Sequence, residues 1–180
     1  MSVTQQDAAE ALRLVHDAGT RSELLRGYQS ASPHLILWGC VYFVAYAFGY
    51  FWPTQAGLPW IVLVPIASIG DVIIGKRDRT GGDWTIFPIL FCTFLAFIIG
   101  TAFIMQPHDP KQMGAFVPLL VAACYIALGV GAGKRIMYTG VALGVLTLFG
   151  FFALPAFFLL WMAVVGGGAL ILGGLWLRQV

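Results

Sequence analysis

The stretch VPIASIGDVIIGKR, residues 64–77, decides the fold class of this chain. It completes an apolar run that starts near residue 58, and its last three residues, Gly-Lys-Arg, end that run. Comparable uninterrupted runs recur along the chain, and a helix that spans a bilayer needs about 20 apolar residues. Strands of a membrane barrel would instead alternate apolar and polar residues. We therefore predict an all-α, polytopic membrane protein.

The overall composition agrees with this prediction. Of the 180 residues, 59% are hydrophobic and 10% are charged, whereas soluble domains carry about 25% charged residues. The first 33 residues lack a basic stretch followed by an apolar core, so we expect no cleavable signal peptide. The formal net charge of +2 gives no reason to expect a nucleic-acid partner. The expected surroundings are the lipid bilayer.

Six apolar segments between residues 33 and 180 are long enough to form a six-helix transmembrane bundle. Prolines lie near the start of most of them, where a helix loses no hydrogen bond. Only Pro65 lies well inside a segment, which predicts a kink in the second span. The predicted spans are residues 33–52, 58–75, 85–105, 116–133, 136–153 and 155–177.

The segment before the bundle, residues 1–32, is polar. Capping patterns that begin at Thr4 and Thr20 predict two short helices, separated by Gly19. Ser32-Pro33 then predicts a new helix start for the first span. We expect this segment in the cytoplasm, either packed beneath the bundle or docking another protein.

The basic residues predict the orientation of the chain in the membrane. If the N-terminus is inside, every Lys and Arg except Lys111 lies on the cytoplasmic side. Such an excess is the positive-inside pattern. We therefore expect a bacterial-type inner-membrane protein with both termini in the cytoplasm.

A weak internal repeat suggests that the six spans form three helical hairpins. The tripeptide Gly75-Lys76-Arg77 recurs as Gly133-Lys134-Arg135, and each copy ends an even-numbered span. The alternative is that glycine commonly ends helices and basic residues face the cytoplasm. Under that alternative, the tripeptide occurs twice although the chain contains no structural repeat.

Small residues at regular spacing predict close packing between helices in the fourth, fifth and sixth spans. In lipid, glycine faces let two helix backbones approach closely. The same faces could serve as a seam between copies of the chain, above all on the sixth span. The positions are Gly129, Gly133, Gly140, Gly144, Gly166, Gly167, Gly173 and Gly174.

Asp71 is the first candidate functional residue, because it is the only acid inside an apolar segment. An ionisable side chain within a membrane helix is costly unless paired, so it marks a functional position by default. Ser68 shares its helical face, and His34 and Arg135 lie on the same expected side of the membrane. The alternative is an ion pair with a neighbouring Lys or Arg that only holds the bundle together.

An aromatic stripe on the first span is the second candidate. Trp38, Tyr42, Tyr46 and Tyr50 recur every four residues, so they lie along one helical face. Their polar groups should find partners inside the bundle. Together with the second span around Pro65, they could line a cavity for a flat or amphiphilic ligand. The alternative is ordinary packing between helices.

The cysteines are a third, weaker candidate. Cys40, Cys92 and Cys124 lie at similar depth on three different predicted spans, and three thiolates would suit Cu(I) or Zn²⁺. However, lone buried cysteines usually behave as small hydrophobic residues. We therefore predict no metal site, and the sequence implies no cofactor.

No catalytic motif is present in the sequence, so we do not expect an enzyme. Zinc-protease, nucleophile-elbow and phosphate-loop patterns are all absent. Two functions remain open. The first is a small transporter or channel-like protein with a cavity lined by the second span and the aromatic stripe. The second is a sensor or scaffold that docks a cytoplasmic protein through residues 1–32.

Overall fold

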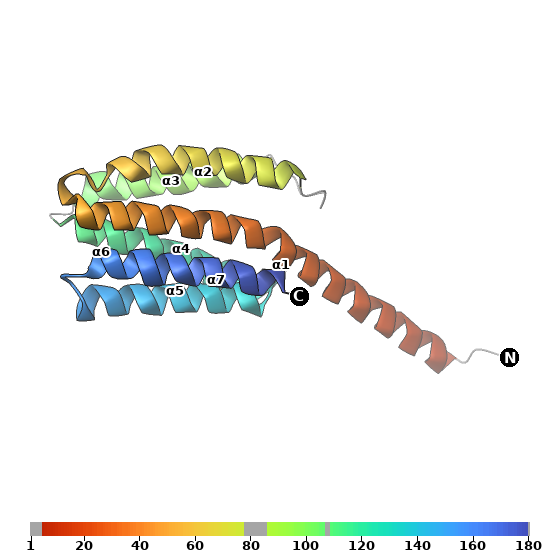
Figure 1. The fold of residues 1–180 in the computed structure, drawn as a ribbon. Coiled ribbons are helices and arrows are strands. Elements are labelled where there is room, and N and C mark those ends of the chain that lie inside the picture. The colour runs from red at the N-terminus through yellow and green to blue at the C-terminus, as the bar shows by residue number, and fades with distance from the viewer. Residues whose placement is uncertain (1–4, 78–85, 107–108, 180) are drawn as a thin grey trace.

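The computed structural model describes residues 5–77, 86–106 and 109–179, and these ranges are helical almost throughout (Figure 1). The predicted all-α fold is confirmed for this part of the chain. Five of its helical segments are long and apolar enough to cross a membrane, and the 20-residue α3 is a further apolar helix. The α-helices are α1 (Gln5–Phe51), α2 (Leu58–Arg77), α3 (Ile86–Met105), α4 (Pro110–Ala132), α5 (Lys134–Ala153), α6 (Phe158–Trp161) and α7 (Gly167–Arg178). Two short turns complete the list, the 3-10 turn η1 (Pro53–Gln55) and the π-helical turn η2 (Met162–Gly166), which joins α6 to α7.

Most of the predicted spans agree with these helices to within a few residues, but α4 starts earlier than predicted. It begins at Pro110, because Asp109 caps it: the Asp109 carboxylate accepts a hydrogen bond from the backbone N–H of Lys111 at 2.8 Å. A proline at the first helical position suits such a start, since its missing N–H would have no partner there.

The first helix, α1, continues through both sites where we predicted a break. The predicted interruptions at Gly19 and at Ser32-Pro33 are wrong, because α1 runs over 47 residues. The Thr20 hydroxyl does not cap a new helix but donates to the carbonyl of His16, one turn earlier, at 2.9 Å. The N-terminal half of α1 leaves the bundle at an angle to the rest of the helix (Figure 1), and its described side chains are mostly exposed.

The helix pairs that pack most closely are α1 with α7 and α4 with α5, and α5 also contacts α7. The helix α2 packs against α1, whereas α3 makes few close approaches to any described helix. No described side chain of α3 is fully buried. This pairing differs from the three sequential hairpins that the repeat suggested, since α3 and α4 do not form a closely packed unit.

Glycines allow the close contact between α1 and α7. A Cβ atom at Gly39 would lie 2.9 Å from the carbonyl oxygen of Gly167, and one at Gly174 would lie 2.9 Å from that of Ser32. The Ser32 hydroxyl donates to the carbonyl of Gly174 at 2.8 Å. Because the two backbones touch, larger residues at these positions would separate the helices.

Glycines also line the contact between α4 and α5. A Cβ atom at Gly129 would lie 2.5 Å from the backbone nitrogen of Met137. The two helices are joined at Gly133, whose φ of +113° favours glycine. The other predicted glycines also meet neighbours within the chain: Gly140 lies against Ala122 and Tyr125, Gly144 against Ala122, Gly166 against Met162, and Gly173 against Thr139 and Leu35.

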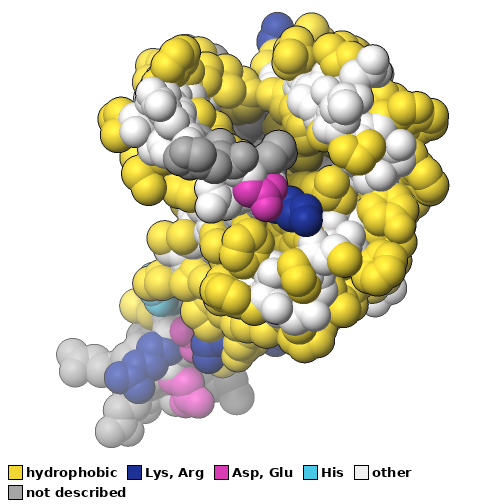
Figure 2. All heavy atoms as spheres, turned by 90° about the vertical axis from the view of Figure 1, so that its left-hand side faces the viewer, with side chains coloured by type: hydrophobic (Ala, Val, Ile, Leu, Met, Phe, Trp, Pro, Cys, Tyr) yellow, Lys and Arg dark blue, Asp and Glu magenta, His cyan; other side chains and the backbone are white. Residues whose placement is uncertain are grey.

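Apolar side chains cover much of the outside of the bundle. Figure 2 looks along the helices and shows hydrophobic side chains around the sides of the molecule. Large apolar residues of α2, α3 and α5 are more than half exposed, among them Ile61, Phe103 and Phe152. Such an exterior is typical of a protein embedded in a membrane, where lipid tails cover it.

Candidate functional site

The candidate site is built around the buried face of α2. Ala67 and Asp71 are four residues apart on this helix, and they are 1% and 2% exposed. Gly75, one turn further on, is also buried. Because Ala67 and Gly75 are small, α2 can approach α1 closely enough for the short Asp71 side chain to reach it.

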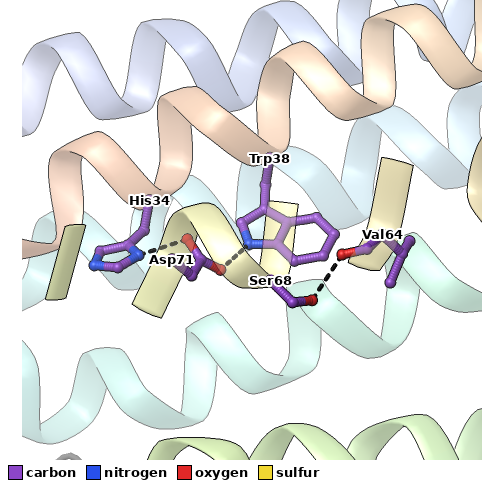
Figure 3. A network of polar contacts seen from close by, with 5 residues as sticks. All are labelled: His34, Trp38, Val64, Ser68 and Asp71. Carbon is purple, nitrogen blue, oxygen red and sulfur yellow. Dashed lines mark hydrogen bonds and ion pairs between the residues drawn. The ribbon is translucent and has the colours of Figure 1, made fainter. Parts of the chain in front are cut away.

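Two side chains of α1 hold the Asp71 carboxylate (Figure 3). Its Oδ1 lies 2.7 Å from His34 Nδ1, and its Oδ2 accepts a hydrogen bond from Trp38 Nε1 at 2.6 Å. His34 and Trp38 are one helical turn apart, so both face α2. We call these three residues the Asp71 centre.

The described partners of Asp71 differ from the Lys or Arg that we considered as the alternative; the Arg77 side chain and Arg79 lie outside the described part of the chain. The carboxylate is held by His34 and Trp38, while Arg135 lies elsewhere. Its guanidinium donates to the carbonyl of Trp176 at 2.9 Å, lies 4.8 Å from the centre of the Trp176 ring and approaches the Tyr28 ring. Arg135 therefore joins the end of α7 to α1 and α5.

The pair of His34 and Asp71 can hold or pass on a proton. Imidazole exists as a cation or as either of two neutral tautomers, and a carboxylate can only accept hydrogen bonds unless protonated. Both contacts of Asp71 are short, at 2.7 and 2.6 Å, which is the range for a hydrogen bond with an ionised partner. A proton shared between Nδ1 and Oδ1 would move less than the 2.7 Å between them.

Two other residues predicted for this site on α2 do not contact the carboxylate. The hydroxyl of Ser68 donates to the carbonyl of Val64 in its own helix, at 2.7 Å (Figure 3). Pro65 is exposed, so its ring lies away from the buried face that carries Asp71. The helix α2 remains continuous through Pro65.

The aromatic stripe of α1 divides in two. Tyr42 and Tyr46 are 3% and 2% exposed, and their rings pack edge to face with each other and with Trp60 of α2, with ring centres 5.1 to 5.5 Å apart. Tyr50 instead packs against the ring of Phe51. Trp38, Tyr42 and Tyr46 of the stripe therefore face α2, whereas Tyr50 does not.

The two buried tyrosines differ in their hydrogen bonds. The Tyr46 hydroxyl donates to the carbonyl of Gly114, near the start of α4, at 2.5 Å. The Tyr42 hydroxyl is fully buried and has no hydrogen-bond partner among the described residues. A buried polar group of this kind is unusual and calls for an explanation.

Sequence reasoning missed two aromatic residues, Trp60 and Tyr125, that pack against the core around Tyr42 and Tyr46. Trp60, near the start of α2, is partly buried and packs against the core beside Tyr42 and Tyr46. Tyr125 of α4 packs against both buried clusters of the bundle, one of which contains Tyr42 and Tyr46. The available signal was that Tyr125 is the only hydroxyl-bearing residue in the fourth apolar segment. We call Tyr42, Tyr46, Trp60 and Tyr125 the tyrosine cluster.

The cysteines lie apart from this site. All three are free thiols; Cys40 and Cys92 are exposed, and Cys124 is partly exposed. Within residues 5–77, 86–106 and 109–179, no three side chains of His, Cys, Asp or Glu are close enough to hold a metal ion. Comparison of the chain with models of known protein families, with curated proteins and with solved structures finds no match.

Proposed function

We propose that this chain is a six-span inner-membrane protein that transports a small solute or ion, with the Asp71 centre as its polar site. One observation carries the proposal: a carboxylate that is 2% exposed lies between two apolar helices and is held by an imidazole and an indole. Ionisable groups inside membrane helices are costly, and they commonly mark ion and substrate pathways. The tyrosine cluster extends the polar groups from this centre toward the other end of the bundle.

The six spans of this proposal are α1 to α5 and the continuous segment formed by α6, η2 and α7. In this arrangement both termini lie in the cytoplasm, because nearly all basic residues then lie on that side. Asp71 lies about one turn from Lys76, so the carboxylate is near the cytoplasmic end of α2. Gly114, the partner of Tyr46, lies near the opposite end of the bundle.

We propose a role without covalent chemistry. The buried polar groups of the site are a carboxylate, an imidazole, an indole and phenols, and the Ser68 hydroxyl is engaged with its own helix. These groups suit the binding and release of ions or protons better than nucleophilic attack, for which a nucleophile must contact a general base.

The test is ion flux through purified protein in liposomes. Currents across a solid-supported membrane would be recorded under imposed gradients of H⁺, Na⁺ and K⁺. We expect a current for at least one ion with the native protein, and none above protein-free liposomes with Asp71→Asn. Asp17→Asn is the matched control, because Asp17 is exposed on the protruding half of α1. Currents that are absent with the native protein, or equal with Asp71→Asn, would contradict the proposal.

A second function, docking of a cytoplasmic protein, is favoured by the protruding half of α1. Leu12, Leu14 and Val15 are 71%, 65% and 71% exposed on this segment. Docking predicts that deletion of residues 1–26 abolishes the cellular role of the protein, while Asp71→Asn is tolerated. Transport predicts the reverse. Complementation of a deletion strain by the two variants distinguishes them.

A further inference from the structure

We infer that the transported ion is the proton, and that it travels between the Asp71 centre and Tyr46 by way of Tyr125 and Tyr42. This inference rests on the proposed transport function and names its substrate and route. The groups along the route come from three helices: Asp71 from α2, Tyr42 and Tyr46 from α1, and Tyr125 from α4.

The inner end of the route is suited to a proton rather than to a metal cation. Both oxygens of the Asp71 carboxylate already contact a ring nitrogen, one of His34 and one of Trp38. Each oxygen keeps a further lone pair, but no group of three His, Cys, Asp or Glu side chains among the described residues is close enough to hold a metal ion there. A proton needs no further ligand, because it can move between His34 Nδ1 and Asp71 Oδ1. Among the described residues of α2, Lys76 is the ionisable group nearest to Asp71 in sequence, and its side chain is exposed.

The middle of the route is the Tyr42 hydroxyl. It is fully buried in the bundle, and no described protein group bonds to it. Leaving such a group without a partner is costly, so a water molecule or the group in transit is expected to satisfy it. Tyr125 of α4 packs against the core that contains Tyr42 and Tyr46, so it brings a third phenol to this part of the bundle.

The outer end of the route is Tyr46, which donates to the carbonyl of Gly114. His34 and Tyr46 are separated by about 18 Å along α1, at 1.5 Å per residue. The hydrocarbon core of a bilayer is about 30 Å thick. The route therefore covers more than half of the apolar layer. Its two ends, at His34 and at Tyr46, lie toward the two water-facing ends of the bundle.

Charge balances at each step of this relay. A phenol accepts a proton on one lone pair of its oxygen while it releases its own proton to the next acceptor, so no tyrosine ends with a charge. The relay requires a water molecule wherever two oxygens do not touch directly, and at the outer end the Tyr46 hydroxyl must turn from the Gly114 carbonyl to release its proton to water. The Asp71 centre gains one proton from one side and loses one to the other, which restores its starting state.

Tyr42→Phe is the decisive variant, because it removes only the hydroxyl that lacks a protein partner. Protein-containing liposomes would be loaded with the pH-sensitive dye pyranine, and a K⁺ diffusion potential would be set with valinomycin. We expect Tyr42→Phe to slow proton entry on the order of 100-fold, a typical contribution of a positioned proton-transferring group. The matched control is Tyr138→Phe, since Tyr138 is exposed on α5, and it should keep the native rate.

The protein fold is checked in parallel by thermal unfolding of each variant in detergent, and the native rate is also measured in D₂O. Tyr42→Phe should unfold at nearly the native temperature, and the native flux should be slower in D₂O than in H₂O. Native flux in Tyr42→Phe, or equal rates in the two solvents, would overturn the route. A Na⁺ or K⁺ current without proton flux would overturn the choice of ion and leave transport standing. Absence of every current would overturn both.

Discussion

At the scale of single residues, one carboxylate of α2 holds two side chains of α1. Asp71 has two oxygens, and each meets a ring nitrogen of α1, from His34 and from Trp38. Removing one partner would leave the other group buried with an unsatisfied hydrogen-bonding atom, which costs about 1–3 kcal/mol. The three side chains are therefore expected to behave as a unit.

This coupling gives the first prediction. Trp38→Phe removes the indole donor, and Asp71→Asn removes the charge of the acceptor. The free energy of unfolding, measured by circular dichroism in mixed micelles, should show a coupling of about 0.5–3 kcal/mol in the double-mutant cycle. In a control cycle, Trp52→Phe with Asp71→Asn should be additive to within about 0.5 kcal/mol, since Trp52 is exposed at the far end of α1. Additivity in the first cycle would show that the indole contributes nothing to holding Asp71.

At the scale of elements, α1 shows how packing overrides a local capping pattern. Ser32 has the residue type of a helix cap, yet its hydroxyl donates to the carbonyl of Gly174 on α7. Pro33 removes one backbone N–H from the helix, but it does not end it. The backbone contacts at Gly39 and Gly174 hold the segment helical against α7, so the segment before the bundle continues the first span.

The contact between α1 and α7 gives the second prediction. Alanine at Gly174 would place its Cβ 2.9 Å from the carbonyl oxygen of Ser32, whereas alanine at Gly168 would meet nothing within 4 Å. We expect Gly174→Ala to lower the free energy of unfolding by about 1–3 kcal/mol, as overpacking does. Gly168→Ala should leave stability unchanged or raise it by up to about 1 kcal/mol through helix propensity. Equal effects of the two substitutions would mean that α1 and α7 do not touch through Gly174.

At the scale of the whole molecule, the packing is uneven. The segments α1, α4, α5 and α7 form the closely packed part, while α2 rests on α1 and α3 makes few contacts with other described helices. Whether α3 crosses the bilayer decides on which side every later segment lies. The six-span proposal therefore depends on α3 more than on any other helix.

The third prediction tests this arrangement. In a chain whose native cysteines are replaced by alanine, Gln112→Cys and Thr20→Cys each introduce one thiol at an exposed position. With six spans and a cytoplasmic N-terminus, a membrane-impermeant maleimide should label Gln112→Cys in intact cells. It should label Thr20→Cys only after permeabilisation. Identical labelling of the two variants would show that the number of crossings between them is even, so that α1, α2 and α3 do not all span the membrane.

The all-α class and the approximate helix positions could be predicted from the residues alone, and Asp71 could be singled out as the acid within an apolar segment. The physical reason is that lipid offers no hydrogen bonds to the backbone, so a long apolar run must be helical whatever surrounds it. A lone acid in such a run also needs a partner within the protein, because lipid offers it no hydrogen bonds. The same reasoning predicted His34 as a possible partner of Asp71, because the two residues lie on the same expected side of the membrane.

Which helix faces meet could not be read from the residues and is known only from the folded bundle. Tyr42 and Tyr46 pack with Trp60 while Tyr50 does not, and Tyr125 joins the cluster from a helix far along the chain. These outcomes, and the pairing of α1 with α7, depend on shape and close backbone approach between distant segments. The residue types along one helix show that a face is suited to packing. Which helix packs against that face depends on the shapes of all the helices in the bundle.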